Sequence, residues 1–518
     1  MTQDCHTPIL DRGRNYWCDA EASRVGMLVD GDDYYRAFYE AAQRATRYIL
    51  LAGWQFDTDA CLLRGKEAEG APLPVTLLAY LDALCKRNPD LRIYVLAWDF
   101  HAVFAIEREW MQAWRFRWLT SDRLQFQFDA NHVEGGSHHQ KFVVIDGQMS
   151  FLGGLDLCDH RWDDRKHHDP NPLRVSRGEP HRPFHDVQTY MVSSGIGAKL
   201  TELFEARWRG AGGEPLQLAE PTGSFADYEP AASTPLAARR VALSRVDPFG
   251  MPEGVPGCRE ITDLTLDAIA VARRLIYVET QYFSSKEVGD ALAARLKATD
   301  REPLDVVLVL NEHAETVKEE VAVGLAQAKV IKELREAVAG SPNHLGIYYT
   351  VPCTEPGVEP EHATYIHSKL LVVDDCFMSI GSANLTNRST CIDTELNLAV
   401  EVSGDDPELQ RSIRAARRSL LAEHLGVPDL EQTEGLVAEL DERANQRDGR
   451  LRQHPSPTPG EREILDVIDP MVLPFDPGAP EVGDRSIFVG GVGALWDRFV
   501  AAPKKPTEFM EDRRSALG

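Results

Sequence analysis

Residues 138–147 read HHQKFVVIDG, and residues 366–375 read IHSKLLVVDD. Both contain the pattern H-x-K-x4-D. Successive side chains of a β-strand point to opposite faces, so the histidine and lysine of each copy face the same way. The apolar residues that follow predict a buried strand, and the aspartate with its neighbour predicts a tight turn into the next strand. The sequence therefore predicts two strand starts, each presenting an imidazole and an ammonium group side by side.

The two copies belong to a longer internal duplication. An apolar strand that ends in aromatic residues precedes each copy, and Phe56 lies 83 residues before His139 while Phe283 lies 84 residues before His367. The matched segments are 48–56 with 275–283, 91–100 with 303–312, 138–147 with 366–375, 151–157 with 378–386, and 185–194 with 394–403. Five segments in one order at nearly one spacing predict two similar α/β lobes.

The pattern also predicts the boundaries of these lobes. We assign residues 1–215 to an N-terminal lobe and 236–426 to a C-terminal lobe, because the Gly-, Pro- and Ser-rich stretch 211–235 is typical of a linker. Residues 427–518 lack the pattern and are interpreted as a peripheral tail around the body.

Two facing sets of imidazole and ammonium groups suit the chemistry of a phosphodiester. Two lysines can stabilise the charge on its oxygens during displacement without a metal ion. One neutral imidazole can attack phosphorus, while a second, protonated one gives a proton to the leaving alkoxide. Histidine suits both tasks because its unperturbed pKa is about 6.5. We therefore expect a phosphohistidine intermediate and neither a metal nor a cofactor.

These residues resemble the phospholipase D superfamily, whose signature is the doubled motif, over residues 48–403. Four segments are similar to the phospholipase D enzymes themselves: GGLDLCDHRWD from residue 153, PFHDV from 183, YVETQYF from 277 and IGSANLTNRS from 380. The resemblance implies two α/β sandwich lobes related by a pseudo-twofold, with the active site in the cleft between them.

The resemblance also implies roles for individual residues. His139 would be the nucleophile and His367 the general acid, although pseudo-symmetry leaves the reverse order open. The other expected site residues are Lys141 and Lys369 with Asn384 on the phosphate, Asp186 and Glu395 behind the imidazoles, and Asp156, Ser382 and Gly154 near the substrate. Asp146 and Asp374 are expected to fix strand ends and lobe packing.

Two features depart from this pattern or allow two interpretations. Asp156 stands where many superfamily members have Asn, which leaves its phosphate role open. The segment 158–186 has no counterpart in the second half and contains five histidines: His160, His167, His168, His181 and His185. Without close metal-ligand spacing, we favour a cleft-shaping loop with solvated histidines over a metal site.

A third ambiguous feature is a row of tryptophans. Trp110, Trp114 and Trp118 share one helix face. We expect this face to pack in the core, with an aromatic membrane rim as the alternative.

Charge and composition restrict the binding partners and the cellular location that we expect for this protein. Lys and Arg total 56 against 81 Asp and Glu, a formal net charge of −25, which repels polyanions and argues against nucleic acid. Membrane spans and a secretory signal are not expected, because no stretch has about 20 consecutive apolar residues and the N-terminus lacks a basic and apolar leader. The nine cysteines are scattered without C-x-x-C, so we expect a reducing compartment, the cytoplasm, with export by a non-classical route left open.

The expected activity is hydrolysis of glycerophospholipids to phosphatidic acid and a free head group, by an enzyme that meets the membrane surface transiently. Transfer of the phosphatidyl group to an alcohol is an associated expectation. The alternatives are a phospholipid synthase similar to cardiolipin synthase and a nucleic-acid phosphodiesterase of the same superfamily. The head group and the oligomeric state stay open.

Overall fold

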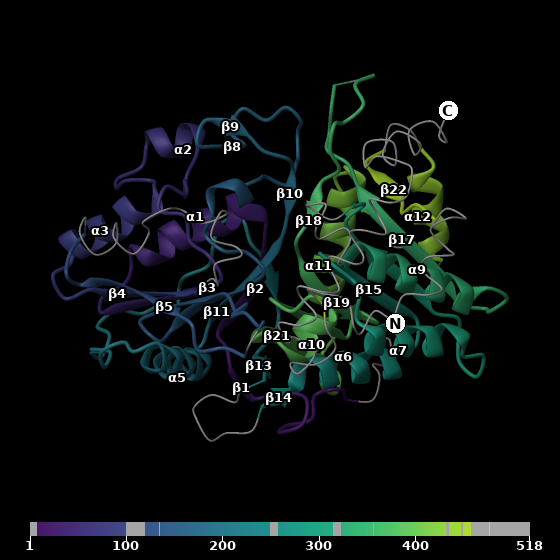
Figure 1. Ribbon diagram of the computed structural model, residues 1–518, viewed down its shortest axis with the longest axis horizontal. Coiled ribbons are helices and arrows are strands. Elements are labelled where there is room, and N and C mark those ends of the chain that lie inside the picture. The colour runs from purple at the N-terminus through teal and green to yellow at the C-terminus, as the bar shows by residue number, and fades with distance from the viewer. Residues whose placement is uncertain are drawn as a thin grey trace, which may run out of the picture.

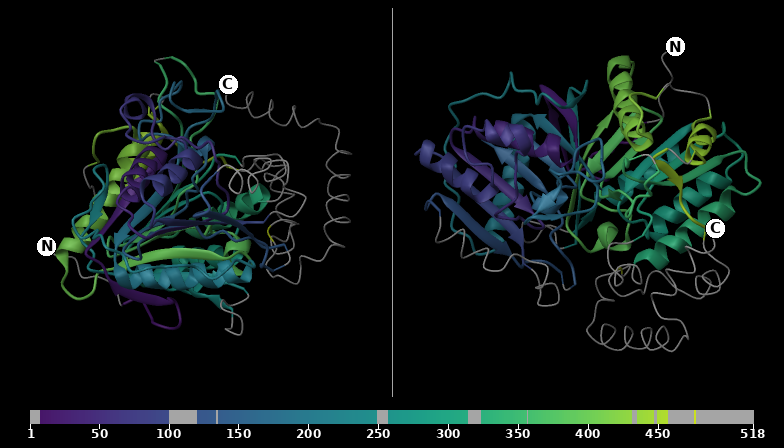
Figure 2. Two further views of the ribbon diagram at one scale, coloured as in Figure 1. Left: turned by 90° about the vertical axis from the view of Figure 1, so that its left-hand side faces the viewer. Right: turned by 90° about the horizontal axis from the view of Figure 1, so that it is seen from above.

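The computed structural model shows two groups of elements side by side, one from each half of the sequence (Figure 1; Figure 2, right). The structure describes residues 8–99, 120–133, 135–248, 257–313, 323–355, 357–430, 435–446, 449–456 and 476. The predicted tryptophan face at residues 110–118 lies outside these ranges. Each group contains one large mixed β-sheet with helices packed on it, as an α/β fold requires.

The first sheet runs through eight described strands. In spatial order these are β12 (Thr234–Leu236), β2 (Arg24–Val29), β11 (Val187–Val192), β7 (Met149–Gly153), β6 (Phe142–Ile145), β3 (Tyr48–Gly53), β4 (Arg92–Trp98) and β5 (Leu124–Asp129). Strands β3, β4 and β5 are parallel, and the others pair antiparallel. Strands β6, β7 and β11 are buried throughout, because helices cover one face of the sheet and the second lobe contributes to the other.

The second sheet has the same order of strands, position by position. Its described strands are β1 (Cys18–Glu21), β13 (Arg240–Asp247), β21 (Glu395–Glu401), β20 (Phe377–Gly381), β19 (Lys369–Val373), β15 (Leu275–Thr280), β16 (Asp305–Val309) and β17 (His344–Thr350), with β22 (Leu451–Gln453) added at one edge and β14 (Cys258–Arg259) beside β13. Again the three strands β15, β16 and β17 are parallel. The two sheets therefore repeat one strand order, which corresponds to the duplicated segments of the sequence.

One edge strand lies in the sheet of the opposite half, and another comes from the predicted linker. β1 comes from the start of the chain but pairs antiparallel with β13 of the second sheet. β12, at the end of the predicted linker, pairs with β2 of the first sheet. The sequence boundary at residues 215–236 therefore does not separate the two sheets completely, because a short edge strand is held by its partner strand rather than by its place in the chain.

Helices cover the sheets, and four of those described begin with a side-chain cap. In the first half these are α1 (Asp30–Ala42), α2 (Gly65–Glu69), α3 (Leu77–Arg87) and α5 (Ser194–Gly210); in the second half they are α6 (Glu260–Val271), α7 (Lys286–Lys297), α9 (Leu325–Val338), α10 (Asn387–Cys391), α11 (Pro407–Leu425) and α12 (Leu436–Ala444). Helix α11 begins with Asp406 capping the Leu409 N–H and Pro407 in its first turn, and it ends at Gly426 with φ 69°.

The two lobes share one hydrophobic core. The same buried cluster contains Leu200 and Phe204 of α5, Leu420 of α11, and strand residues of both sheets such as Leu152 and Leu398. Two further large clusters lie mainly in one lobe each, although Tyr365 joins the first and Ile9 joins the second. Shared apolar burial therefore holds the lobes in one relative position, which the active-site geometry below depends on.

Part of the predicted tail belongs to the second lobe. α12 follows α11, and β22 pairs antiparallel with β17, so this segment extends the sheet. Asp476 is buried against the Ser284 hydroxyl and the Asn387 side chain. Among the residues that the structure describes, no helix combines the length and apolar character needed to cross a bilayer.

Candidate active site

Backbone pairing between the lobes sets the position of both histidine motifs. In one lobe the His139 N–H donates to the Thr394 carbonyl at 3.0 Å, and in the other the His367 N–H donates to the His185 carbonyl at 2.7 Å. The second contact continues the parallel pairing of β10 (Phe184–His185) with β18 (Tyr365–Ile366). Each motif histidine therefore starts beside a segment of the opposite lobe.

This pairing gives each imidazole a carboxylate from the other lobe. His139 Nδ1 lies 3.0 Å from both oxygens of Glu395, the first residue of β21. His367 Nδ1 lies 2.5 Å from Asp186 Oδ2, directly after β10. The His139 side chain is 16% exposed and that of His367 only 7%. Both rings are thus fixed through Nδ1, which leaves Nε2 as the nitrogen for chemistry on a substrate.

The positive charges at the site favour neutral imidazoles. Burial, then Lys141 and Lys369, lowers the pKa of His139 well below its usual value. Burial, then Lys369 and Arg161, does the same to the pKa of His367, and His139 itself contributes to this lowering. The two rings therefore belong to one electrostatic site. A bound anionic phosphate would offset the lysine charges and raise both pKa values.

The carboxylates behind the rings are perturbed in the opposite direction. Burial raises the pKa of Asp186 to about 6, and burial together with Asp393 raises the pKa of Glu395 to about 8. The form of His139 that can attack through Nε2 carries its proton on Nδ1 and donates it to Glu395. The positive charge of Lys141 favours the ionised carboxylate that this form needs.

Both motif lysines are buried and directed by polar neighbours. Lys141 Nζ donates to the His139 carbonyl at 3.0 Å and lies 3.5 Å from Asp156 Oδ2. Lys369 Nζ donates to the His367 carbonyl and, at 3.1 Å, to Gln281 Oε1. Burial lowers the pKa of Lys369 to about 7, with Lys141 adding to the effect. Burying an unpaired ammonium group costs free energy, so an anionic ligand beside it would stabilise its charged form.

Asn384 lies beside the second lysine. Its Nδ2 donates to Gln281 Oε1 at 3.3 Å, and its buried Oδ1 has no hydrogen-bond partner among the described residues. Gln281 joins Asn384 and Lys369 but was not predicted as a site residue. Its signal was present in the YVETQYF segment, where Glu279, Thr280 and Gln281 stand between apolar and aromatic residues.

Arg161 is a second residue that the sequence reasoning did not assign. It lies in the short 3₁₀ turn Asp159–Arg161, and its guanidinium donates to Asp156 Oδ2 at 2.8 Å and lies 5.9 Å from the centre of the Trp54 ring. Asp156 therefore accepts from Arg161 and lies near Lys141, while its Oδ1 accepts the Trp54 N–H at 2.9 Å. With these partners Asp156 orients cations, a role for which a carboxylate is better suited than the amide of Asn.

The small residues Gly154 and Ser382 lie against the two carboxylates. A Cβ on Gly154 would lie 2.5 Å from Asp186 Oδ1. Ser382 Oγ donates to Glu395 Oε2 at 2.5 Å and accepts the Leu396 N–H at 3.0 Å. The sequence prediction put both near the substrate; these contacts instead favour a role in positioning the carboxylates.

Asp146 and Asp374 hold the start of a neighbouring strand. The Asp146 carboxylate accepts hydrogen bonds from the N–H groups of Thr46, Arg47 and Tyr48 and from the Thr46 hydroxyl, at 2.7–2.9 Å. Asp374 accepts from three successive N–H groups that lead into β15 in the same way. Because both carboxylates bind backbone at the far end of the motif strands, they are placed to stabilise the fold.

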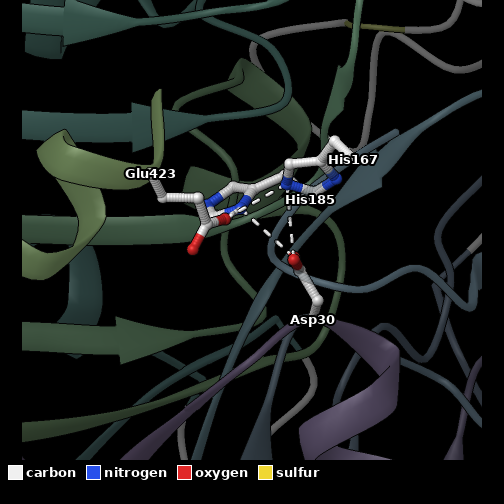
Figure 3. Close-up of side chains that lie close together, drawn as sticks. All are labelled: Asp30, His167, His185 and Glu423. Carbon is white, nitrogen blue, oxygen red and sulfur yellow. Dashed lines mark hydrogen bonds and ion pairs between the residues drawn. The ribbon is translucent and has the colours of Figure 1, made fainter. Parts of the chain in front are cut away.

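The histidine-rich insertion differs from the expected solvated loop. His160 and His168 are exposed, but His167 and His185 are fully buried between acidic side chains. The prediction was wrong for these two because the insertion folds back to the lobe boundary, where Asp30 and Glu423 meet it (Figure 3). The carboxylates come from distant parts of the chain, so no local spacing could show them.

Comparisons with known proteins agree with this fold. A family model described as "Cardiolipin synthase, PLD-like domain" matches residues 265–416. The chain is 25% identical over 484 residues to phospholipase D alpha 4 of Arabidopsis thaliana, covering 75% of this chain, and 26% identical over 538 residues to phospholipase D alpha 1 of Ricinus communis, covering 77%. It spans 63% and 65% of the lengths of these two relatives.

A solved structure shows the same fold at lower identity. Phosphatidylserine synthase of Haemophilus influenzae matches with a TM-score of 0.50 and 13% identity, over 82% of this chain and 91% of that one. This structural match concerns the fold alone. The family model and the curated relatives support a place for this chain in the phospholipase D superfamily.

Proposed function

We propose that this protein is a phosphodiesterase of the phospholipase D type, which hydrolyses glycerophospholipids to phosphatidic acid and a free head group. The observation that carries the proposal is the exchange of carboxylates between the lobes: His139 pairs with Glu395 and His367 with Asp186, around two buried lysines. Two oriented imidazoles with cations between them suit a double displacement at phosphorus.

In the first step His139 Nε2 attacks phosphorus and the bond to the head-group oxygen breaks. His367, protonated once the anionic substrate is bound, gives its Nε2 proton to the departing alkoxide. In the second step His367 takes a proton from water and the water oxygen attacks phosphorus. The bond between phosphorus and His139 Nε2 breaks, and phosphatidic acid leaves. Lys141, Lys369 and Asn384 stabilise the phosphoryl oxygens throughout.

An alcohol can replace water in the second step, which gives head-group transfer. The description of the matching family model names cardiolipin synthase, and a synthase would use this transfer route. The names of the curated relatives favour the hydrolytic reaction. The net charge of −25 disfavours nucleic acid as the substrate, because a polyanion would be repelled at long range.

The test supplies phosphatidylcholine vesicles with and without ethanol and measures choline, phosphatidic acid and phosphatidylethanol. We expect choline release in both conditions and phosphatidylethanol only with ethanol. His139→Ala should lower the rate by about 10³-fold or more, as expected for loss of a nucleophile. His362→Ala, at a side chain 59% exposed, is the matched control and should leave the rate unchanged.

Two results would overturn the proposal. One is an unchanged rate in the folded His139→Ala variant, and the other is cleavage of plasmid DNA with no choline release. The order of the histidines is tested separately with a substrate labelled at phosphorus and a quench at alkaline pH, where phosphohistidine survives. The label should map to the peptide that contains His139, and a label on the His367 peptide would reverse the order.

A further inference from the structure

A second cluster of chemically active side chains lies at the lobe boundary, outside the site described above. Asp30 at the start of α1, His167 and His185 of the insertion, and Glu423 of α11 each turn one donor atom inward, and these atoms lie within 4.8 Å of one another (Figure 3). All four residues are buried. Nothing in the double displacement requires this cluster, so its chemistry needs its own explanation.

We propose that Asp30, His167, His185 and Glu423 form a binding site for one divalent transition-metal ion of the zinc class, which links the insertion to the second lobe. Zinc prefers four ligands of the imidazole and carboxylate type. The site is distinct from the phosphate site, and the proposal does not depend on which substrate the protein hydrolyses.

The distances between donor atoms fit a coordination shell. His185 Nδ1 lies 2.7 Å from Glu423 Oε1 and 3.2 Å from Asp30 Oδ1, and His167 Nε2 lies 3.1 Å from the same Glu423 oxygen. His167 Nε2 also lies 3.3 Å from Asp30 Oδ2. Tetrahedral ligands at about 2.0–2.2 Å from a zinc ion are separated from each other by about 3.3–3.6 Å. Small shifts would therefore admit the ion.

The outer nitrogen of each histidine is held as a metal-bound imidazole requires. His167 Nδ1 lies 2.9 Å from Asp163 Oδ2, and His185 Nε2 lies 2.9 Å from Glu279 Oε2. A carboxylate behind a ligating histidine fixes the ring and strengthens it as a ligand.

These outer carboxylates are themselves anchored. Arg174 donates to Asp163, and the hydroxyls of Tyr277 and Ser368 donate to Glu279. Each donor histidine is therefore held by a carboxylate that is itself held by further hydrogen bonds. Such outer hydrogen bonds keep metal ligands in one geometry.

One oxygen of Asp30 gives further support for a bound cation. Asp30 is 2% exposed, and its Oδ2 accepts no hydrogen bond from any residue that the structure describes, although His167 Nε2 lies 3.3 Å away. Arg165 already binds the other oxygen of Glu423, Oε2, at 2.5 Å. A buried carboxylate oxygen without a hydrogen bond is costly, and a cation between Asp30 and Glu423 would lower that cost.

The neighbouring triad of His185, Glu279 and His424 is the weaker candidate. His185 and His424 each face the Glu279 carboxylate through Nε2, at 2.9 and 3.0 Å, and no fourth donor joins them in the described residues. We therefore assign Glu279 to the support of His185 and not to a second metal.

The alternative explanation is a charged network without metal. Both imidazoles would then carry two protons, and each ring nitrogen would donate to a carboxylate. Metal binding must displace the inward protons of His167 Nε2 and His185 Nδ1, so up to two protons leave per ion bound. This proton release separates the two explanations in an experiment.

The experiment strips the full-length protein with a chelator, reloads it with Zn²⁺ and measures bound metal by elemental analysis. We expect about one ion per chain, an increase in Tm on reloading, and proton release seen by calorimetry in buffers of different ionisation enthalpy. His167→Gln and Glu423→Gln should each weaken binding by about 100-fold or more. His168→Ala, in the same insertion but exposed, should bind as wild type.

The proposal is overturned if the chelated wild-type protein binds no stoichiometric Zn²⁺, Mn²⁺, Fe²⁺ or Co²⁺. It is also overturned if folded His167→Gln binds Zn²⁺ as tightly as wild type. If a variant fails to fold, tetrahedral Co²⁺ absorption in the wild type decides, because nitrogen and oxygen ligands give a spectrum that water does not. Metal binding is read without lipid, so its failure is distinct from failure of the phospholipase reaction.

Discussion

Replacing Asp146 with Asn tests whether this aspartate has a structural role or a catalytic one. Each oxygen of the Asp146 carboxylate accepts two hydrogen bonds: Oδ2 from the N–H and hydroxyl of Thr46, and Oδ1 from the N–H groups of Arg47 and Tyr48. The side chain is buried, and its φ of 52° is one that Asn also tolerates. The substitution therefore removes charge and acceptors without adding backbone strain.

The expected loss of stability follows from these contacts. The amide introduced by Asp146→Asn keeps one oxygen, so two hydrogen bonds to a charged group are lost and two donors face an NH₂ group. At about 1.5–3 kcal/mol for each such bond, the loss is about 3–6 kcal/mol. For a unit of about 200 residues this lowers Tm by on the order of 10 °C. Activity per folded molecule, measured well below Tm, should change by less than about threefold.

Calorimetry and choline release on the same preparation test this expectation. Asp374→Asn should behave alike, because that carboxylate holds the start of β15 in the same manner. Asp227→Asn, at a side chain 79% exposed, is the control and should leave Tm unchanged. An unchanged Tm with about a 100-fold loss of activity in Asp146→Asn would refute the structural role and place this aspartate in the reaction.

Three further outcomes are expected. Burial lowers the pKa of Lys369 to about 7, so its positive charge is lost as the pH rises through 7. We therefore expect kcat/KM to fall in this range, and Lys369→Arg should move the fall to higher pH. A pH profile of kcat/KM for both proteins checks this. Gly154→Ala would push a Cβ to 2.5 Å from Asp186 Oδ1, so kcat should drop by about 100-fold while circular dichroism shows a folded protein; an unaltered kcat would contradict the close packing. Asp406→Ala removes the cap of the Leu409 N–H and should cost about 1 kcal/mol in denaturant unfolding, with no change in kcat.

Much of the fold could be predicted because the duplicated strands carry their own pattern. The apolar runs after His139 and His367 form β6 and β19, and the segments around them occupy matching places in the two sheets. The match of Asp186 with Glu395 was visible as two carboxylates at corresponding strand starts. Their exchange between lobes was not derivable from spacing, because it depends on how the lobes pack.

Other parts of the site depend on contacts that no local pattern records. His167 and Glu423 are 256 residues apart in the chain yet 3.1 Å apart in the structure, so the buried cluster has no sequence signature. We expected Gly154 to be small so that a ligand has room, whereas the Asp186 side chain occupies the space beside it. Strand β1 is too short for its pattern to indicate a sheet, and only pairing with β13 assigns it.

The placement of β1 has a consequence for biosynthesis. Because residues 18–21 pair with residues 240–243, the first strand leaves the ribosome long before its partner exists. The nascent chain must carry that strand unpaired until more than two hundred further residues have been added. A fragment that stops after the first lobe would keep an open strand, so the two lobes are expected to express better as one polypeptide than as separate halves.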